Sequence, residues 1–170
     1  MKNNKLLIAI SLLCLLLLVA VGILNTKESS YQAKYHWKQD PMILACYDST
    51  PTSEALSKAV KYWEVLGYDN VGIINEFNCP IDGRVEGAIT LGLPTSGYDY
   101  SKIAMARAIV DLETQEIYSV RIEILYLQER VLEHEFGHAY GFEDIDVSGN
   151  IMNSNINNGG WNSDGLKKKN

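Results

Sequence analysis

The stretch HEFGHAYGFED at residues 134–144 carries the strongest structural signal in the chain. His134 and His138 are four residues apart, so on a helix both imidazoles lie on one face and can bind a single ion. Glu135 projects beside such an ion, where it can take a proton from a metal-bound water. The chain has only three histidines, and two of them stand at this spacing. A metal site is therefore a better interpretation than an amphipathic helix with two unrelated histidines.

The residues after this helix bring the chain back toward the ion. Gly141 lies seven residues after His134, where the helix must end, and glycine tolerates the left-handed conformation of such a C-terminus. Three carboxylates follow, Glu143, Asp144 and Asp146. Carboxylate oxygen is an acceptable zinc ligand, so chemistry alone does not choose among the three.

The whole string resembles the metzincin signature H-E-x-x-H-x-x-G-x-x-H, with an aspartate in place of the last histidine. The resemblance selects Asp144 as the third ligand, because it alone lies ten residues after His134. The family has a methionine turn beneath its metal, and GNIMN at residues 149–153 places Met152 where this turn is expected. Aspartate as third ligand is similar to snapalysin-type members, whereas the upstream strands resemble those of matrixin-like members.

The resemblance implies a zinc-dependent endopeptidase whose metal ligands are His134, His138 and Asp144. Glu135 is then the general base that activates the attacking water. A peptide or protein substrate is expected to bind extended along an exposed strand edge, and we assign residues 85–93 to that edge.

Two other functions fit the motif. The first is a non-catalytic binding domain in which zinc only fastens the helix to the following loop. Structural zinc sites usually have four protein ligands, whereas this motif supplies three and leaves one position open beside Glu135. The motif therefore favours a catalytic site over a structural one. The second is a hydrolase of a non-peptide amide, which the motif does not distinguish from a peptidase.

Upstream, short apolar runs and one amphipathic segment alternate along the chain. They predict an α/β (α+β) fold of the metzincin or zincin type, with a mixed five-stranded sheet backed by two helices. The expected strands are residues 42–47, 71–77 and 85–94 and a hairpin within residues 102–125. One helix is expected within residues 49–70 and a second at about residues 126–140. Thr52 or Ser53 can cap the first helix and Gly67 can end it. After Met152 only 18 residues remain, so the C-terminal part is very short.

Residues 6–24, LLIAISLLCLLLLVAVGIL, are uncharged and follow two lysines. This pattern predicts either an uncleaved membrane anchor or a cleaved signal peptide. The catalytic domain is then membrane-anchored and extracytoplasmic, or secreted if the segment is removed. We divide the chain into this N-terminal segment at residues 1–24, a tether at residues 25–40 and the catalytic domain at residues 41–170.

The charge and the cysteines narrow the possible partners and the compartment. The net charge is -6, and without residues 1–24 it is -8, from 13 basic and 21 acidic groups. Such a surface repels phosphate backbones, so nucleic acid is not an expected partner. Cys46 and Cys79 remain in the exported part, where they could form a disulfide or stay as two buried thiols.

Overall fold

The computed structural model describes residues 30–47, 51–155 and 157–169. The chain divides into two units, Met1–Ser30 and Tyr31–Asn170, and the second unit holds every described helix and strand. The predicted membrane or signal segment at residues 6–24 lies outside the described residues. No helix within the described part of the chain is long and apolar enough to cross a membrane.

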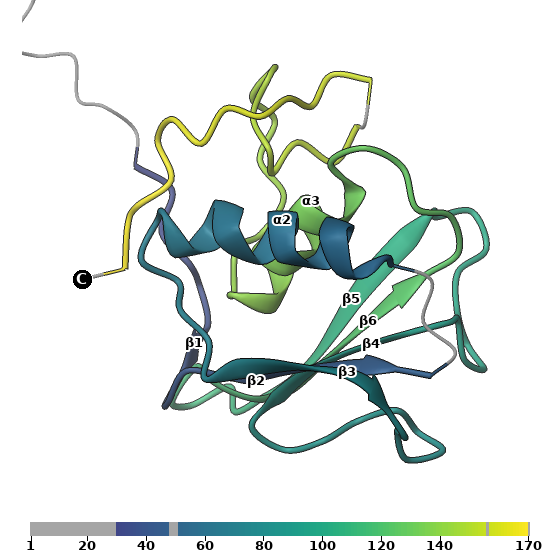
Figure 1. Ribbon diagram of the computed structural model, residues 1–170. Helices are drawn as coiled ribbons and strands as arrows, with labels where there is room; N and C mark the ends of the chain where they lie inside the picture. Colours follow the sequence, from purple (N-terminus) through teal and green to yellow (C-terminus); the bar gives the residue numbers. More distant parts are fainter. Residues whose placement is uncertain (1–29, 48–50, 156, 170) are drawn as a thin grey trace, which may run out of the picture. The chain divides into compact units, whose positions relative to one another are not determined.

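The second unit is a mixed α/β domain in which two helices cover one face of a six-stranded, mostly parallel sheet (Figure 1). The core lies between the helices and the sheet, where the largest side chains, such as Trp63 and Phe136, are fully buried. The elements in chain order are β1 (His36–Trp37), β2 (Met42–Cys46), α2 (Ser53–Glu64), β3 (Gly72–Phe77), β4 (Ala88–Gly92), β5 (Ala104–Val110), β6 (Glu116–Ile124) and α3 (Val131–Ala139).

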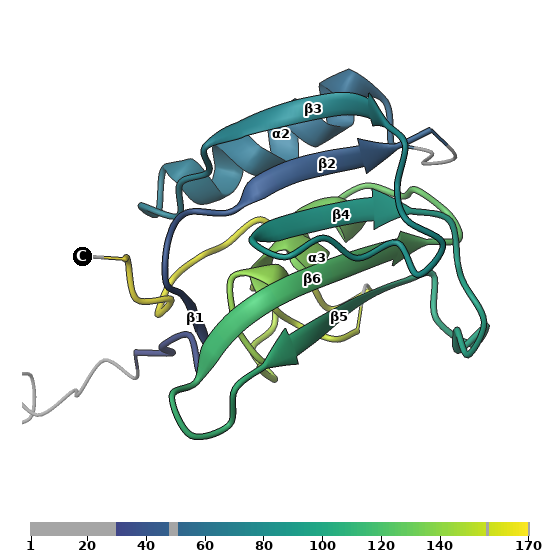
Figure 2. The ribbon, with the colours of Figure 1, turned by 90° about the horizontal axis from the view of Figure 1, so that it is seen from below.

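The strands of the sheet follow the order β3-β2-β4-β6-β5 (Figure 2). All these neighbours are parallel except β5, which runs antiparallel to β6. The sheet backed by two helices confirms the predicted mixed α/β class, but the predicted count of five strands is one too low. The sixth strand is β1, which pairs in parallel with β6 and lies in the polar stretch that the sequence assigns to a tether.

Helix α2 begins where the sequence predicts. The Thr52 side chain accepts a hydrogen bond from the backbone N–H of Ala55 at 3.2 Å, and this satisfies one of the free N–H groups of the first turn. The apolar side chains that recur at helical spacing are buried against the sheet. These side chains are Leu56, Ala59, Val60 and Trp63. Gly67, which follows the helix, adopts a φ of +81°, so the chain reverses at a residue that tolerates this conformation.

The predicted hairpin is formed by β5 and β6. Its turn lacks the usual Asn-Gly or Asp-Gly pair. Instead, the Asp111 side chain accepts hydrogen bonds from the backbone N–H groups of Glu113 and Thr114 at 2.8 and 3.1 Å. An Asp side chain that bonds the backbone two or three residues later closes a turn without glycine.

The assignment of residues 85–93 to an exposed edge is wrong. Strand β4 in this stretch lies between β2 and β6, and all five of its residues are buried. A short apolar run that is buried on both faces is typical of an interior parallel strand. The free edges belong to β3 and to β5, and β5, which pairs only with β6 among the described strands, is the one that packs against α3.

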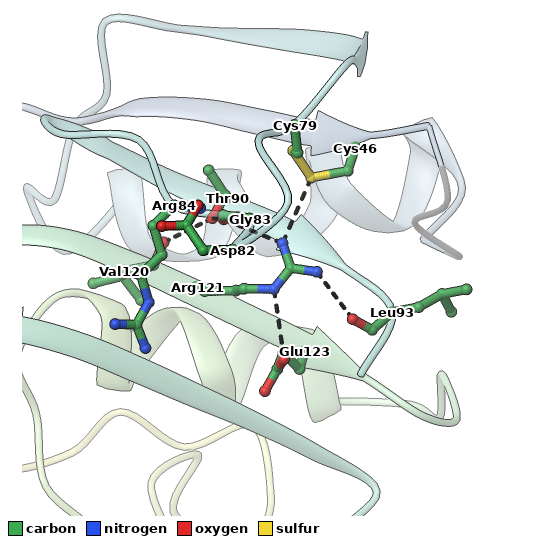
Figure 3. Close-up of a disulfide and its surroundings, with 10 residues drawn as sticks. All are labelled: Cys46, Cys79, Asp82, Gly83, Arg84, Thr90, Leu93, Val120, Arg121 and Glu123. Carbon is green, nitrogen blue, oxygen red and sulfur yellow. Dashed lines mark hydrogen bonds and ion pairs between the residues drawn. A yellow bond between two sulfur atoms is a disulfide. The ribbon is translucent and has the colours of Figure 1, made fainter. Parts of the chain in front are cut away.

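A disulfide between Cys46 and Cys79 joins the end of β2 to the connection between β3 and β4 (Figure 3). It decides between the two states that the sequence left open for these cysteines. The buried Arg121 lies beside it on β6, and its guanidinium donates to the carbonyl oxygens of Gly83 and Leu93 at 3.1 and 3.0 Å. The disulfide and Arg121 together fasten the β3–β4 connection to the sheet.

We expect the double variant Cys46→Ser/Cys79→Ser to unfold more readily than the parent, by about 2–4 kcal/mol, because the cross-link restricts the unfolded chain. Urea denaturation of the full-length protein measures this difference. A reductant should destabilise the parent to the level of the double variant and leave the variant itself unchanged. Equal stability of the parent with and without reductant contradicts the prediction.

Candidate metal centre

Helix α3 carries two of the predicted ligands, but it is shorter than expected. It begins at Val131 rather than near residue 126. The residue before it, Arg130, has a φ of +71°, and this left-handed conformation cannot continue a right-handed helix upstream. The helix therefore starts one turn before His134 and holds both histidines within its nine residues.

The two imidazoles are oriented by backbone carbonyls. His134 Nδ1 lies 2.8 Å from the Ile151 oxygen and His138 Nδ1 lies 2.8 Å from the Phe142 oxygen. A carbonyl oxygen only accepts, so each Nδ1 must carry the proton and donate. In the neutral rings each Nε2 is then an acceptor, and the two Nε2 atoms face each other at 3.0 Å. Two acceptor lone pairs at this distance require a proton or a cation between them.

Asp144 completes the cluster on the turn after α3. Its Oδ1 lies 3.4 Å from Nε2 of His134 and 3.4 Å from Nε2 of His138. When the imidazoles are protonated, hydrogen bonds from His134 and then from His138 lower the pKa of Asp144 well below its usual value. The structure thus brings together the three residues that the sequence proposes as ligands, with their donor atoms within 4.8 Å of one another.

The other two carboxylates of this segment lie outside the cluster. The Glu143 side chain turns to Lys34, whose Nζ lies 2.5 Å from its Oε1. Asp146 is exposed and does not belong to the group of donor atoms around the histidines. Of the three candidates, only Asp144 therefore faces both imidazoles.

Met152 forms the floor beneath the histidine helix. Its side chain is fully buried, and its sulfur lies so close to Gly137 of α3 that a side chain there would collide with it. The turn that holds it is fixed by two hydrogen bonds, from Met152 N to Asn150 Oδ1 and from Ile145 N to Met152 O, both of 2.9 Å. Because Ile151 of the same turn accepts the His134 hydrogen bond, the Met152 turn also fixes the orientation of His134.

Glu135 is buried beside the cluster and lines the same cleft. The Ala106 N–H of β5 hydrogen-bonds its carboxylate, and burial raises its pKa, although the nearby charges of His138 and His134 oppose this rise. Its Oε2 is buried and has no hydrogen-bond partner among the described residues. An unpaired buried carboxylate oxygen is costly unless a water or a ligand contacts it.

The cleft has a volume of about 870 Å³. Strand β5, residues of the turn at 151–154, the two histidines and Glu135 all line it. The free edge of β5 thus runs along the cleft that holds the candidate metal ligands.

No protein-family model and no curated protein matches this chain.

Sequence reasoning missed several groups that build the site. The carbonyl oxygens of Phe142 and Ile151 orient the histidines, yet every residue type has a carbonyl, so no sequence signal marks them. Strand β5 was recognised as a strand but not as the wall of the cleft. Trp37 lies in the stretch that the sequence assigns to a tether. A large aromatic side chain in this polar stretch is the one signal that the segment packs against the domain. Its Nε1 donates to the Ala139 oxygen at the end of α3, at 2.8 Å.

Proposed function

We propose that the chain is a zinc-dependent endopeptidase of the metzincin type. The observation that carries this proposal is the convergence of two imidazole Nε2 atoms and one carboxylate oxygen beside the unpaired, buried oxygen of Glu135. Two nitrogens and one carboxylate oxygen form a donor set that zinc prefers, and three protein ligands leave a position for water or substrate, as in catalytic zinc sites.

The residues fit zinc in protonation state as well as in position. Zinc binds neutral imidazole, and the Nδ1 hydrogen bonds of His134 and His138 leave Nε2 free for a metal. The half-exposed Asp144 is ionised at neutral pH, as aspartate ordinarily is, so it would contribute a negative charge to the site. His134, His138 and Asp144 would hold the ion, which when bound polarises a carbonyl and lowers the pKa of a water molecule.

Glu135 performs the proton transfers in this mechanism. Its carboxylate accepts a proton as the water attacks the scissile carbonyl and then donates that proton to the leaving amine. The raised pKa of Glu135 suits this double role, because a more basic carboxylate is a better proton acceptor near neutral pH. The Ala106 N–H holds the carboxylate toward the cleft.

The edge of β5 supports a peptide as the substrate. An extended peptide that adds to a sheet edge gains main-chain hydrogen bonds at alternate residues whatever its side chains are. Ala104, Ala106 and Ala108 on this strand line the cleft, and their small side chains leave room for a second main chain. A small non-peptide amide would not use this wall.

Three further features support the metzincin type. The left-handed Gly141, with a φ of +94°, ends the helix and begins the turn to Asp144. Met152 lies beneath the histidine helix. Strand β5 is the antiparallel edge of an otherwise parallel sheet. Among the described residues the cluster has three candidate ligands and no fourth, which favours a catalytic site over a structural one.

The test is to measure zinc content and casein hydrolysis of the purified full-length protein. We expect one zinc per chain, loss of hydrolysis with a chelator such as 1,10-phenanthroline, and recovery when zinc is added back. One bound zinc without hydrolysis would point to the non-catalytic zinc domain. Hydrolysis that survives complete removal of metal would contradict the proposed mechanism.

A further inference from the structure

Residues 31–37, here called the N-terminal strap, contact the end of helix α3. The last four carbonyl groups of a helix lack partners within the helix. In α3 one of them, the oxygen of Ala139, accepts a hydrogen bond from the indole of Trp37 at 2.8 Å. Ala139 directly follows the ligand His138, so a residue 102 positions earlier in the chain closes the helix end at the metal site.

The strap also holds the turn that leads to Asp144. The oxygen of Gly141 accepts a hydrogen bond from the backbone N–H of Lys34 at 2.8 Å and a longer one from that of Tyr35 at 3.4 Å. The Tyr35 backbone lies against the Cα of Gly141 so closely that no side chain fits between them. The Lys34 side chain pairs with Glu143, the neighbour of Asp144. The turn between the second and third candidate ligands is thus bonded to the strap at both ends.

The strap is itself anchored to the rest of the domain. His36 and Trp37 pair in parallel with Glu116 and Ile117 of β6. At the other end, the oxygen of Tyr31 accepts a hydrogen bond from the backbone N–H of Lys167 at 2.8 Å. Because the strap is fixed at both ends, it can hold the turn between His138 and Asp144 in place.

Asp144 depends on this support. Its side chain is half exposed, and among the described residues its polar contacts are those with the two histidines. Without a metal, the position of the carboxylate follows the backbone on its two sides, which is the path from Ala139 to Glu143 and the hydrogen bond from the Ile145 N–H to the Met152 oxygen. The path from Ala139 to Glu143 is bonded to the strap.

We propose that the N-terminal strap positions Asp144 and so sets the metal affinity of the site, with the Lys34 N–H and the Trp37 indole as the positioning groups. This inference rests on the proposed zinc site. The proposal also implies that the residues before Tyr31 and the strap itself differ in their effect on the site. Cleavage before Tyr31 leaves the site intact, whereas cleavage within the strap lowers its affinity for zinc.

The test compares zinc dissociation constants of full-length variants, measured by competition with a chromophoric chelator. Lys34→Pro removes the N–H that bonds Gly141, and the matched control Lys34→Ala removes only the side chain. Trp37→Phe removes the indole donor and keeps an aromatic ring. We expect the dissociation constant to rise about 10- to 100-fold for Lys34→Pro and for Trp37→Phe, the range for lost support of a metal ligand. Lys34→Ala should change it less than about fivefold, because exposed ion pairs contribute little.

Urea denaturation of the metal-free variants separates positioning from a general structural role. A merely structural strap would lower the stability of the metal-free protein and leave the dissociation constant unchanged. Constants within twofold of the parent for both Lys34→Pro and Trp37→Phe overturn the proposal while leaving the zinc peptidase intact. A parent protein that binds no zinc overturns the metal centre and the role of the strap together.

Discussion

The Glu135→Ala protein is expected to bind zinc like the parent and to hydrolyse casein about 10²- to 10⁴-fold more slowly, the usual contribution of a general base. Zinc is retained because Glu135 is outside the group of candidate ligands. Turnover is lost because no other described carboxylate lines the cleft with a buried oxygen that lacks a hydrogen-bond partner. The measurements are zinc content and initial rates at matched protein concentration.

Glu133 offers a matched control for this experiment. It lies on the same helix two residues earlier and is also buried, but it does not line the cleft. Glu135→Gln keeps the shape of the side chain and cannot accept the proton, so it should lose as much activity as Glu135→Ala. Glu133→Gln should keep its turnover. An active Glu135→Ala protein would remove this residue from the mechanism.

The local parts of the fold were predictable from the sequence because local spacing determines them. The cap at Thr52 and the apolar periodicity of α2 act within a few residues, and alternation on both sides of LETQE at residues 112–116 predicted the hairpin. The histidine pair belongs to the same class, since a four-residue spacing on a helix fixes a common face.

The parts that were not predictable depend on pairing between distant segments. β4 and β5 both show strand patterns, and only the order of the sheet makes β5 the edge beside the cleft. The disulfide required the distance between Cys46 and Cys79, which are 33 residues apart, and spacing does not give that distance. The strap was hidden because a two-residue strand such as β1 is too short for a periodic pattern.

The left-handed Arg130 explains the error at the start of α3. Arginine is a good helix former, so nothing in the sequence before Val131 ended the predicted helix. Non-glycine residues with positive φ are uncommon and are held by their surroundings. The guanidinium of Arg130 lies against Gly159 beside the cleft, a contact across 29 residues that local propensity does not include.

Asp144→Ala is expected to abolish tight zinc binding, with a loss greater than the roughly 100-fold that follows removal of an outer partner of a ligand. The reason is geometric. The Asp144 Oδ1 lies 3.4 Å from each of the two imidazole Nε2 atoms, so its loss removes the only carboxylate of the three-residue cluster. Calorimetric zinc titration of the full-length protein gives the dissociation constant directly.

Glu143→Ala and Asp146→Ala are the controls, because they remove the same charge from the same segment. Glu143 turns to Lys34, and this exposed pair contributes little, so Glu143→Ala should bind zinc nearly as the parent does. Asp146 is exposed and outside the cluster, so its removal should weaken binding at most partly. The three variants carry the same net charge. A difference between their zinc dissociation constants therefore reflects the position of the lost carboxylate and not long-range electrostatics. If Asp144→Ala binds zinc like the parent while Asp146→Ala does not, the third ligand lies two residues further along the chain.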